Sequence, residues 1–91
     1  MKIIKTPIFK RYEKKLTPNE LNQLKKAEKL LLQNPNHPSL NLKKIICQKE
    51  KSRFSIRINK NYRVLFDKQN DNYYFHCICN HNEYDKINKN C

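Results

Sequence analysis

The spacing of hydrophobic residues changes at about residue 40, and this change limits the possible folds more than any other feature of the chain. Before it, apolar residues recur every three or four positions, as on one face of a helix: Leu21, Leu24, Ala27, Leu31 and Leu32. After it, apolar and polar residues alternate, as in strands with one buried face. A helical half followed by a strand half, within 91 residues, predicts one α+β domain that spans residues 1–91.

Start signals divide the first half into a short strand and two helices. Residues 2–5 are a strand candidate, and Thr6-Pro7 predicts the start of a helix that runs to about Lys15. Thr17-Pro18-Asn19-Glu20 has the pattern of a capping box, which predicts the start of a second helix. Prolines after residue 34 end that helix, because proline cannot continue it.

The second half contains four strand candidates, at residues 42–47, 53–58, 62–66 and 73–79. The last is almost continuously apolar or aromatic, which is typical of a central strand covered on both sides. The chain has no glycine, so we expect asparagines to take the positive φ angles of its turns. The predicted fold is an N-terminal strand and a helical hairpin packed on an antiparallel sheet of about four strands (β-α-α-β-β-β). Residues 82–88 are a candidate for a short C-terminal helix.

Alternation divides these strands into a core face and an open face. The predicted core face carries Phe54, Ile56, Ile58, Tyr62, Val64 and Phe66. The predicted open face is a concave groove that carries Arg53, Ser55, Arg57 and Arg63. The same parity puts His76 on the face opposite His81, where we interpret it as a half-buried packing residue.

The net charge of +12 favours a polyanionic partner: nucleic acid, a ribosome, an anionic membrane or an acidic protein. An alternative explanation of the charge is genome composition, because lysine and asparagine are both encoded by A/T-rich codons and both are abundant here. The arginines fit this alternative less well, because three of the four lie within one stretch: Arg53, Arg57 and Arg63.

The cysteines are expected to be reduced thiols in the cytoplasm, because neither a secretion signal nor an apolar run of membrane-spanning length is visible. Cys77, Cys79 and His81 alternate like metal ligands. However, Cys77 and His81 would lie roughly 13 Å apart on an extended strand, too far for one tetrahedral zinc ion. We therefore expect the cysteines to pack as small apolar side chains. We expect neither a bound metal nor a cofactor.

Several motifs follow one another in an order that resembles the RelE/ParE superfamily of small bacterial toxins. A helical hairpin precedes His37-Pro38-Ser39-Leu40 and Lys43-Lys44-Ile45, and the strands Phe54–Asn59 and Tyr62–Phe66 follow. The last motif, His81-Asn82-Glu83-Tyr84-Asp85, is close to the His-Asp-Glu-Tyr ending common in the group. The resemblance covers nearly the whole chain in element order.

The resemblance implies a toxin with an acidic antitoxin protein as its partner. RelE-like members enter the ribosomal A site and cut mRNA, whereas ParE-like members inhibit DNA gyrase and lack the nuclease residues. The RelE-like branch implies catalytic roles for Arg57, Arg63, His81 and Tyr84. Ser55 stands where the best-known member has a second catalytic lysine, so a lysine-based mechanism is not expected. A third alternative is an inactive relative that retains a basic binding surface.

These residue types suit the cleavage of RNA by its own 2′-hydroxyl. Arg57 and Arg63 would stabilise the charge that develops on the phosphoryl oxygens. His81 would be the general acid or base, with Glu83 as the alternative base, and Tyr84 would stack on a base or orient the phosphate. RNA binding is expected from Lys43, Lys44, Arg53 and Ser55. A structural alternative stays open for each residue. In it, Arg57 and Arg63 are surface residues of the sheet and His81 is a turn histidine without a chemical role. Glu83 is then an acid at a helix start, and Tyr84 holds the C-terminus on the sheet.

Overall fold

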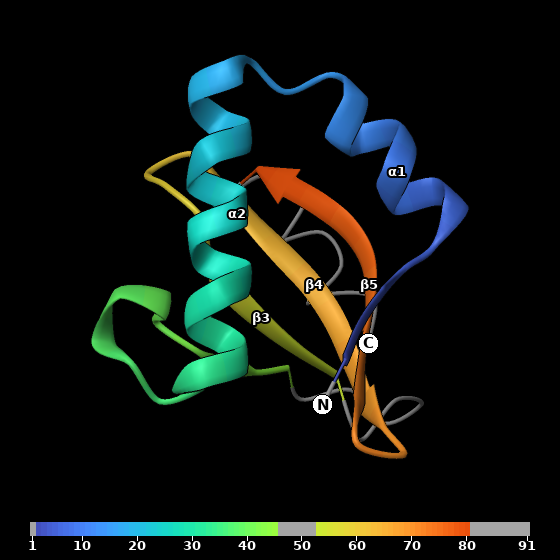
Figure 1. The fold of residues 1–91 in the computed structure, drawn as a ribbon, viewed down its shortest axis with the longest axis vertical. Helices are drawn as coiled ribbons and strands as arrows, with labels where there is room; N and C mark the ends of the chain where they lie inside the picture. The colour runs from blue at the N-terminus through green and yellow to red at the C-terminus, as the bar shows by residue number, and fades with distance from the viewer. Residues whose placement is uncertain (1, 46–52, 81–91) are drawn as a thin grey trace.

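Two helices lie across one face of a five-stranded sheet (Figure 1). This computed structural model describes residues 2–45 and 53–80. The first part holds β1 (Lys2–Lys5), α1 (Pro7–Lys14), α2 (Pro18–Gln33), the 3₁₀ helix η1 (Pro38–Leu40) and β2 (Lys43–Lys44). The second part holds β3 (Arg53–Arg57), β4 (Tyr62–Gln69) and β5 (Asn72–Asn80). The predicted α+β class and its order of elements are confirmed.

The strand order is β1-β5-β4-β3-β2, and all neighbours are antiparallel except β1 and β5, which run parallel. The sequence predicted an antiparallel sheet of about four strands, so the parallel edge strand is the main difference. β5 is flanked by β1 and β4, as expected for a strand that is apolar on both faces. The backbone N–H and C=O groups of a buried strand need partners on both edges, and β1 supplies the second edge of β5.

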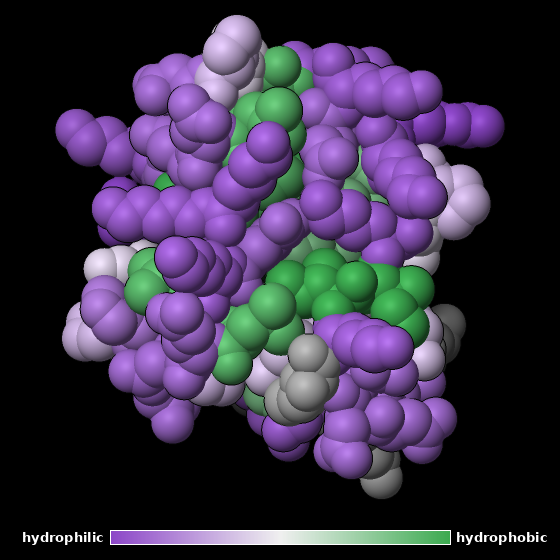
Figure 2. Space-filling model, viewed as in Figure 1, coloured by the Kyte–Doolittle hydropathy of each residue, from purple (hydrophilic) through white to green (hydrophobic). Residues whose placement is uncertain are grey.

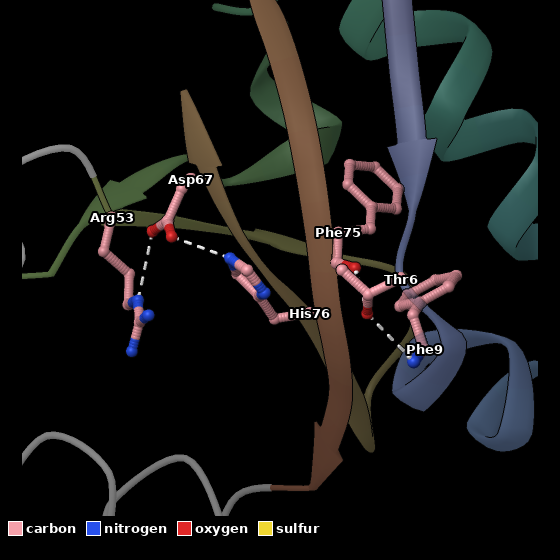
Figure 3. Close-up of polar contacts among 6 residues, drawn as sticks. All are labelled: Thr6, Phe9, Arg53, Asp67, Phe75 and His76. Carbon is pink, nitrogen blue, oxygen red and sulfur yellow. Dashed lines mark hydrogen bonds and ion pairs between the residues drawn. The ribbon is translucent and has the colours of Figure 1, made fainter. Parts of the chain in front are cut away.

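Both predicted helix starts are present, with the expected hydrogen bonds. The Thr6 hydroxyl accepts from the Phe9 amide at 3.2 Å and donates to the Phe75 carbonyl at 2.9 Å, which ties α1 to β5 (Figure 3). Thr17 and Glu20 form the reciprocal capping box of α2.

One residue of the predicted apolar face of α2 points elsewhere. Leu24, Ala27 and Leu31 are buried, but Leu32 is 48% exposed, so its assignment to the same face of the helix was wrong. At 3.6 residues per turn, Leu32 is rotated by about 100° from Leu31 and leaves the stripe that faces the sheet.

The prediction that asparagines take the positive φ angles of the turns is confirmed for the turn between β4 and β5, but not for the turn between β3 and β4. Asn70 and Asp71 have φ of 52° and 63°, which joins β4 to β5 through two left-handed residues, and Asn41 ends η1 with φ of 45°. Asn59 acts through its side chain, whose oxygen accepts the amide protons of Asn61 and Tyr62.

The main core lies between the helices and the sheet and is built around three phenylalanines. The Phe75 ring lies 5.2 Å from that of Phe9 on α1 and 5.7 Å from that of Phe66 on β4. Figure 2 shows that hydrophilic residues cover most of the helical face, with hydrophobic residues gathered in its middle beside α2. No helix in the described residues is long and apolar enough to cross a membrane.

Lys5 connects β1 to both helices. Its ammonium group lies 2.6 Å from a carboxylate oxygen of Glu13 on α1 and 2.8 Å from one of Glu28 on α2. Partial burial by itself would lower the pKa of Lys5, but the two carboxylates outweigh it, and the pKa is raised above its ordinary value.

Candidate nucleic-acid interface

The sheet face that is turned away from the helices carries the predicted arginines. The register of β3 and β4 pairs Arg57 with Arg63, Ser55 with Leu65, and Arg53 with Asp67. Residues paired directly across two antiparallel strands point to the same side of the sheet. The structure therefore brings Arg53, Ser55, Arg57 and Arg63 to one face, as the alternation predicted.

Arg63 and Ser55 do not line an open groove, and this part of the prediction was wrong. Arg63 is only 6% exposed and Ser55 is fully buried. The Arg63 guanidinium donates to the Ser55 hydroxyl at 3.1 and 3.0 Å and to the Asn41 carbonyl at 2.7 Å. These hydrogen bonds replace water around the cation, which is why it tolerates burial.

Arg57 is the exposed member of the pair. Its Nε donates to the Asn59 carbonyl at 3.2 Å, which anchors the stem of the side chain at the end of β3. Arg57 also borders a shallow pocket that it shares with Lys26 of α2 and Ser39 of η1. A second cation at the rim makes this end of the sheet attractive to phosphate groups.

The two lysines of β2 separate onto opposite faces. Lys43 pairs with Ser55 and Lys44 with Phe54, and both lysines are exposed at the edge of the sheet. Only Lys43 therefore lies on the face of the arginines, whereas Lys44 lies on the side of the core residue Phe54.

Arg53, Asp67 and His76 form a charged cluster that sequence reasoning missed (Figure 3). Arg53 Nε donates to Asp67 Oδ1 at 3.1 Å, and His76 Nε2 lies 2.7 Å from Asp67 Oδ2. Burial would raise the pKa of Asp67, but the hydrogen bonds and charges of Arg53 and His76 outweigh it and leave the pKa below its ordinary value. The carboxylate is thus held ionised between two partners.

A β-bulge interrupts the parity that placed His76 opposite His81, which lies outside the described residues; His76 is half-buried, as predicted. Leu65 pairs with Cys77 but Phe66 pairs with Phe75, so His76 is an extra residue in β5. The bulge puts His76 and Cys77 on the same side of the sheet, where strict alternation would separate them. The sequence signal of the bulge is a change in the alternation of buried residues along β5. The buried positions are odd-numbered before the bulge (Tyr73 and Phe75), whereas Ile78 is buried after it.

A small second hydrophobic cluster lies on this face beside the arginines. It contains Ile45, Leu65 and Cys79, with Cys77 packed against them. Both cysteines are free thiols with sulfur atoms 2.8 Å apart, and Cys79 is buried like a small apolar side chain. Within residues 2–45 and 53–80, no group of three His, Cys, Asp or Glu side chains is placed to hold a metal ion.

Three predicted site residues, His81, Glu83 and Tyr84, lie outside the described residues, as does the candidate helix at 82–88. Their roles stay predictions. The described part of the site is therefore the arginine face with its neighbouring Arg53–Asp67–His76 cluster.

The fold is that of several small bacterial and archaeal toxins. It is similar to YafQ from E. coli strain BL21(DE3), at 14% identity over 88% of this chain and 92% of that chain, with a TM-score of 0.71. It is also similar to a chain of the RelBE2 toxin–antitoxin complex from Mycobacterium tuberculosis, at 18% identity, 88% and 96% coverage, and a TM-score of 0.69. A chain of the RelB–RelE antitoxin–toxin complex from Methanococcus jannaschii matches at 15% identity, 92% and 96% coverage, and a TM-score of 0.69.

A helical hairpin on one face of a mostly antiparallel sheet is the arrangement that this chain shares with these proteins. The family model of the ParE-like toxin domain matches residues 21–86, which is most of the chain. The chain belongs to the ParE-like toxin family, and the resemblance predicted from the sequence is confirmed. No curated protein sequence matches it significantly.

Proposed function

We propose that this chain is the toxin of a type II toxin–antitoxin system and acts as a ribosome-dependent mRNA endoribonuclease. The observation that carries the proposal is the pairing of Arg57 with Arg63 on the sheet face opposite the helices. Two neighbouring guanidinium groups suit a phosphodiester, whose cleavage places extra negative charge on the phosphoryl oxygens.

The two arginines would have different roles in binding the phosphate. Arg57 is exposed and available to a phosphate, whereas Arg63 is held by Ser55 and Asn41 and would supply a fixed positive charge behind it. A fixed charge needs no reorganisation during the reaction, which is how preorganised sites stabilise transition states. Lys43 and Arg53 on the same face would bind the RNA backbone on either side.

The reaction would use the 2′-hydroxyl of the RNA as nucleophile. A base removes its proton, the oxygen attacks phosphorus, and an acid protonates the departing 5′-oxygen. His81 is the proposed acid or base, Glu83 is the alternative base, and Tyr84 would orient the substrate by stacking. The products would be a 2′,3′-cyclic phosphate and a 5′-hydroxyl.

The cognate partner would be an acidic antitoxin. Two of the structurally similar toxins are seen in antitoxin complexes. The net charge of +12 favours an acidic segment that folds on binding and covers the arginine face. The proposed compartment is the cytoplasm, where mRNA and the ribosome are found.

A second candidate function is inhibition of DNA gyrase without nuclease activity. The observation that favours it is the match to a ParE-like family model, since the resemblance to the RelE/ParE superfamily implies this activity for ParE-like members. On this alternative Arg63 would be structural, which agrees with its burial.

The test is induction of the protein in growing cells, with the ends of translated mRNAs mapped. Cleavage with 2′,3′-cyclic phosphate ends is expected for the wild type, and strong loss of cleavage for Arg57→Ala and His81→Ala. Lys25→Ala, which removes an exposed charge from α2, is the matched control. Intact mRNA, or cleavage that survives both substitutions, rules out the proposal, and gyrase-dependent DNA breaks with intact mRNA select the second candidate.

A further inference from the structure

The edge of β3 is open beyond Ser55, and this joins the arginine face to the side of the helices. β2 pairs with β3 only at Phe54 and Ser55, so Arg57 lies beyond the last paired residue on that side. Among the described residues no other strand covers this edge, because β2 ends the sheet. The exposed Arg57 therefore stands where the sheet is open, with Arg63 paired to it on the other side.

A polar pocket lies at this open edge, between the sheet and α2. Its polar lining consists of Arg57 from β3, Gln23 and Lys26 from α2 and Ser39 from η1, and four apolar residues complete it. The pocket has a volume of about 240 Å³. A water molecule occupies about 30 Å³ of the liquid, so the pocket has room for a phosphate group.

The four polar side chains of the pocket can all donate hydrogen bonds, and none of them is acidic. Arg57 and Lys26 are donors only, whereas Gln23 and Ser39 donate from an amide and a hydroxyl. Two cations without a carboxylate in the same lining give a positive local potential, which favours an anion.

The glutamates of the two helices are engaged elsewhere. Glu13 and Glu28 both bind Lys5, on β1. Glu20 accepts the amide proton of Thr17 in the capping box of α2. The charge of the pocket is therefore not neutralised by an acidic side chain that binds Lys26.

Asn59 holds two of the donors in place. Its side-chain amide donates to Gln23 Oε1 at 2.9 Å, so the Gln23 amide nitrogen is left to donate to a ligand. Its backbone carbonyl accepts from Arg57 Nε, which leaves the two terminal nitrogens of the guanidinium for a ligand. In Figure 1 the turn that contains Asn59 lies beside α2, as this hydrogen bond requires. Donors that are held before a ligand arrives lower the entropic cost of binding it.

A phosphate group of an RNA strand fits this arrangement. Phosphate oxygens accept charge-assisted hydrogen bonds from guanidinium and ammonium groups. Because Arg57 lines the pocket and is also paired with Arg63, the pocket adjoins the place where the proposed function puts the reacting phosphate. A strand that crosses the arginine face would therefore bring a neighbouring phosphate to the pocket.

Resting on the proposed function for its ligand, we propose that this pocket is a second phosphate subsite, which binds the phosphate next to the reacting one. Lys26, Ser39 and the Gln23 amide bind that phosphate, and Arg57 lies between it and the reacting phosphate. A second hollow, which also contains Gln23 and is bordered by Lys60, continues the path along the start of α2. The RNA strand thus leaves the sheet around the open edge of β3 and passes onto the side of the helices.

The test measures binding of a short single-stranded RNA whose 2′-hydroxyls are methylated, so that they cannot attack the phosphate. Fluorescence anisotropy gives the affinity at several salt concentrations. Lys26→Ala should weaken binding about three- to tenfold at low salt. It should also reduce the slope of log affinity against log salt by roughly 0.7, the share of one phosphate contact. Lys25→Ala removes the same charge from the adjacent exposed position outside the pocket, and both changes should be much smaller.

Ser39→Ala tests the pocket without a change of charge. It should weaken binding about two- to fivefold, because one hydrogen bond to the phosphate is lost, and it should leave the salt slope unchanged. Wild-type affinity in this variant would show that the phosphate does not enter the pocket. Equal effects of Lys25→Ala and Lys26→Ala would show that net charge alone governs binding, and would also overturn the subsite.

A short polyglutamate peptide, titrated in the same way, separates RNA from an acidic protein as the ligand. If Lys26→Ala weakens binding of the peptide but not of the RNA, the pocket holds carboxylates and the proposal is overturned. Cleavage of mRNA in cells judges the proposed function separately. Wild type that shows the Lys26 effect on RNA binding but leaves mRNA intact contradicts the proposed function and leaves the subsite standing. Wild type that cleaves mRNA while Lys26→Ala binds RNA like Lys25→Ala overturns the subsite alone.

Discussion

Arg57 and Arg63 are neighbours in register, yet their surroundings differ. Arg57 is exposed with one backbone partner, whereas Arg63 is buried and holds both Ser55 and the Asn41 carbonyl. Alternation placed both on the correct face, but it carries no information about what else covers that face. The contact with Asn41 spans 22 positions of sequence and could not be predicted from spacing.

Arg63→Ala should lower the free energy of unfolding by about 2–3 kcal/mol, because it leaves a buried hydroxyl and a carbonyl without their charged donor. Arg57→Ala should change it by less than about 0.5 kcal/mol, as expected for an exposed site. Urea unfolding of both variants checks this. Equal effects would show that Arg63 has no special structural role.

Asp67 makes a pH-dependent contribution to stability. Its pKa is lowered in the folded state from 3.8, so the stabilisation is fully present above that value and is lost as pH falls through the folded pKa. The slope of unfolding free energy against pH below about pH 4 should therefore be smaller in Asp67→Asn than in wild type. Unfolding curves between pH 2 and about pH 6 measure it, and identical slopes would contradict the ionised Arg53–Asp67–His76 cluster.

At the scale of elements, the helices could be predicted more completely than the strands. A capping box is a local pattern of four residues, so Thr17 and Glu20 were sufficient to find the start of α2. The bulge at His76 depends on how β5 pairs with β4, and a single-residue shift of phase within an apolar strand gives a weak signal. The bulge puts Cys77 on the same face as His76, which strict alternation along β5 does not predict.

Thr17→Ala should destabilise the protein by about 1 kcal/mol, because it removes the acceptor for the Glu20 amide. For a chain of this size the midpoint of thermal unfolding should fall by roughly 4–8 °C. Thr17→Ser keeps the acceptor and should behave like the wild type. A loss as large in the serine variant would mean that the methyl group, not the cap, stabilises α2.

At the scale of the whole molecule, the net charge follows from composition alone, whereas the sheet topology follows from contacts between distant segments. The charge of +12 can be read directly, but the face on which it acts follows from the sheet that the helices cover on one side. The parallel pairing of β1 with β5 joins distant segments and has no local signature.

Binding of single-stranded RNA should weaken steeply with salt, because each neutralised phosphate contributes roughly 0.7 to the slope of log affinity against log salt. Arg57→Ala should reduce the slope by about one such contact. Lys25→Ala removes the same charge from α2 and should leave the slope nearly unchanged. Titrations at several salt concentrations test this, and equal reductions would mean that net charge alone governs binding.

The pairing of Lys2 with Asn72 has a consequence for how the chain is made. During translation β1 emerges first, but its hydrogen-bonding partner is added about 70 positions later. Contacts between such distant segments form slowly, since loop closure must precede them. The arginine face likewise needs β4 beside β3. A nascent chain that has not reached β5 therefore lacks the assembled sheet, and the arginine face is supported on both sides only after β5 has been made.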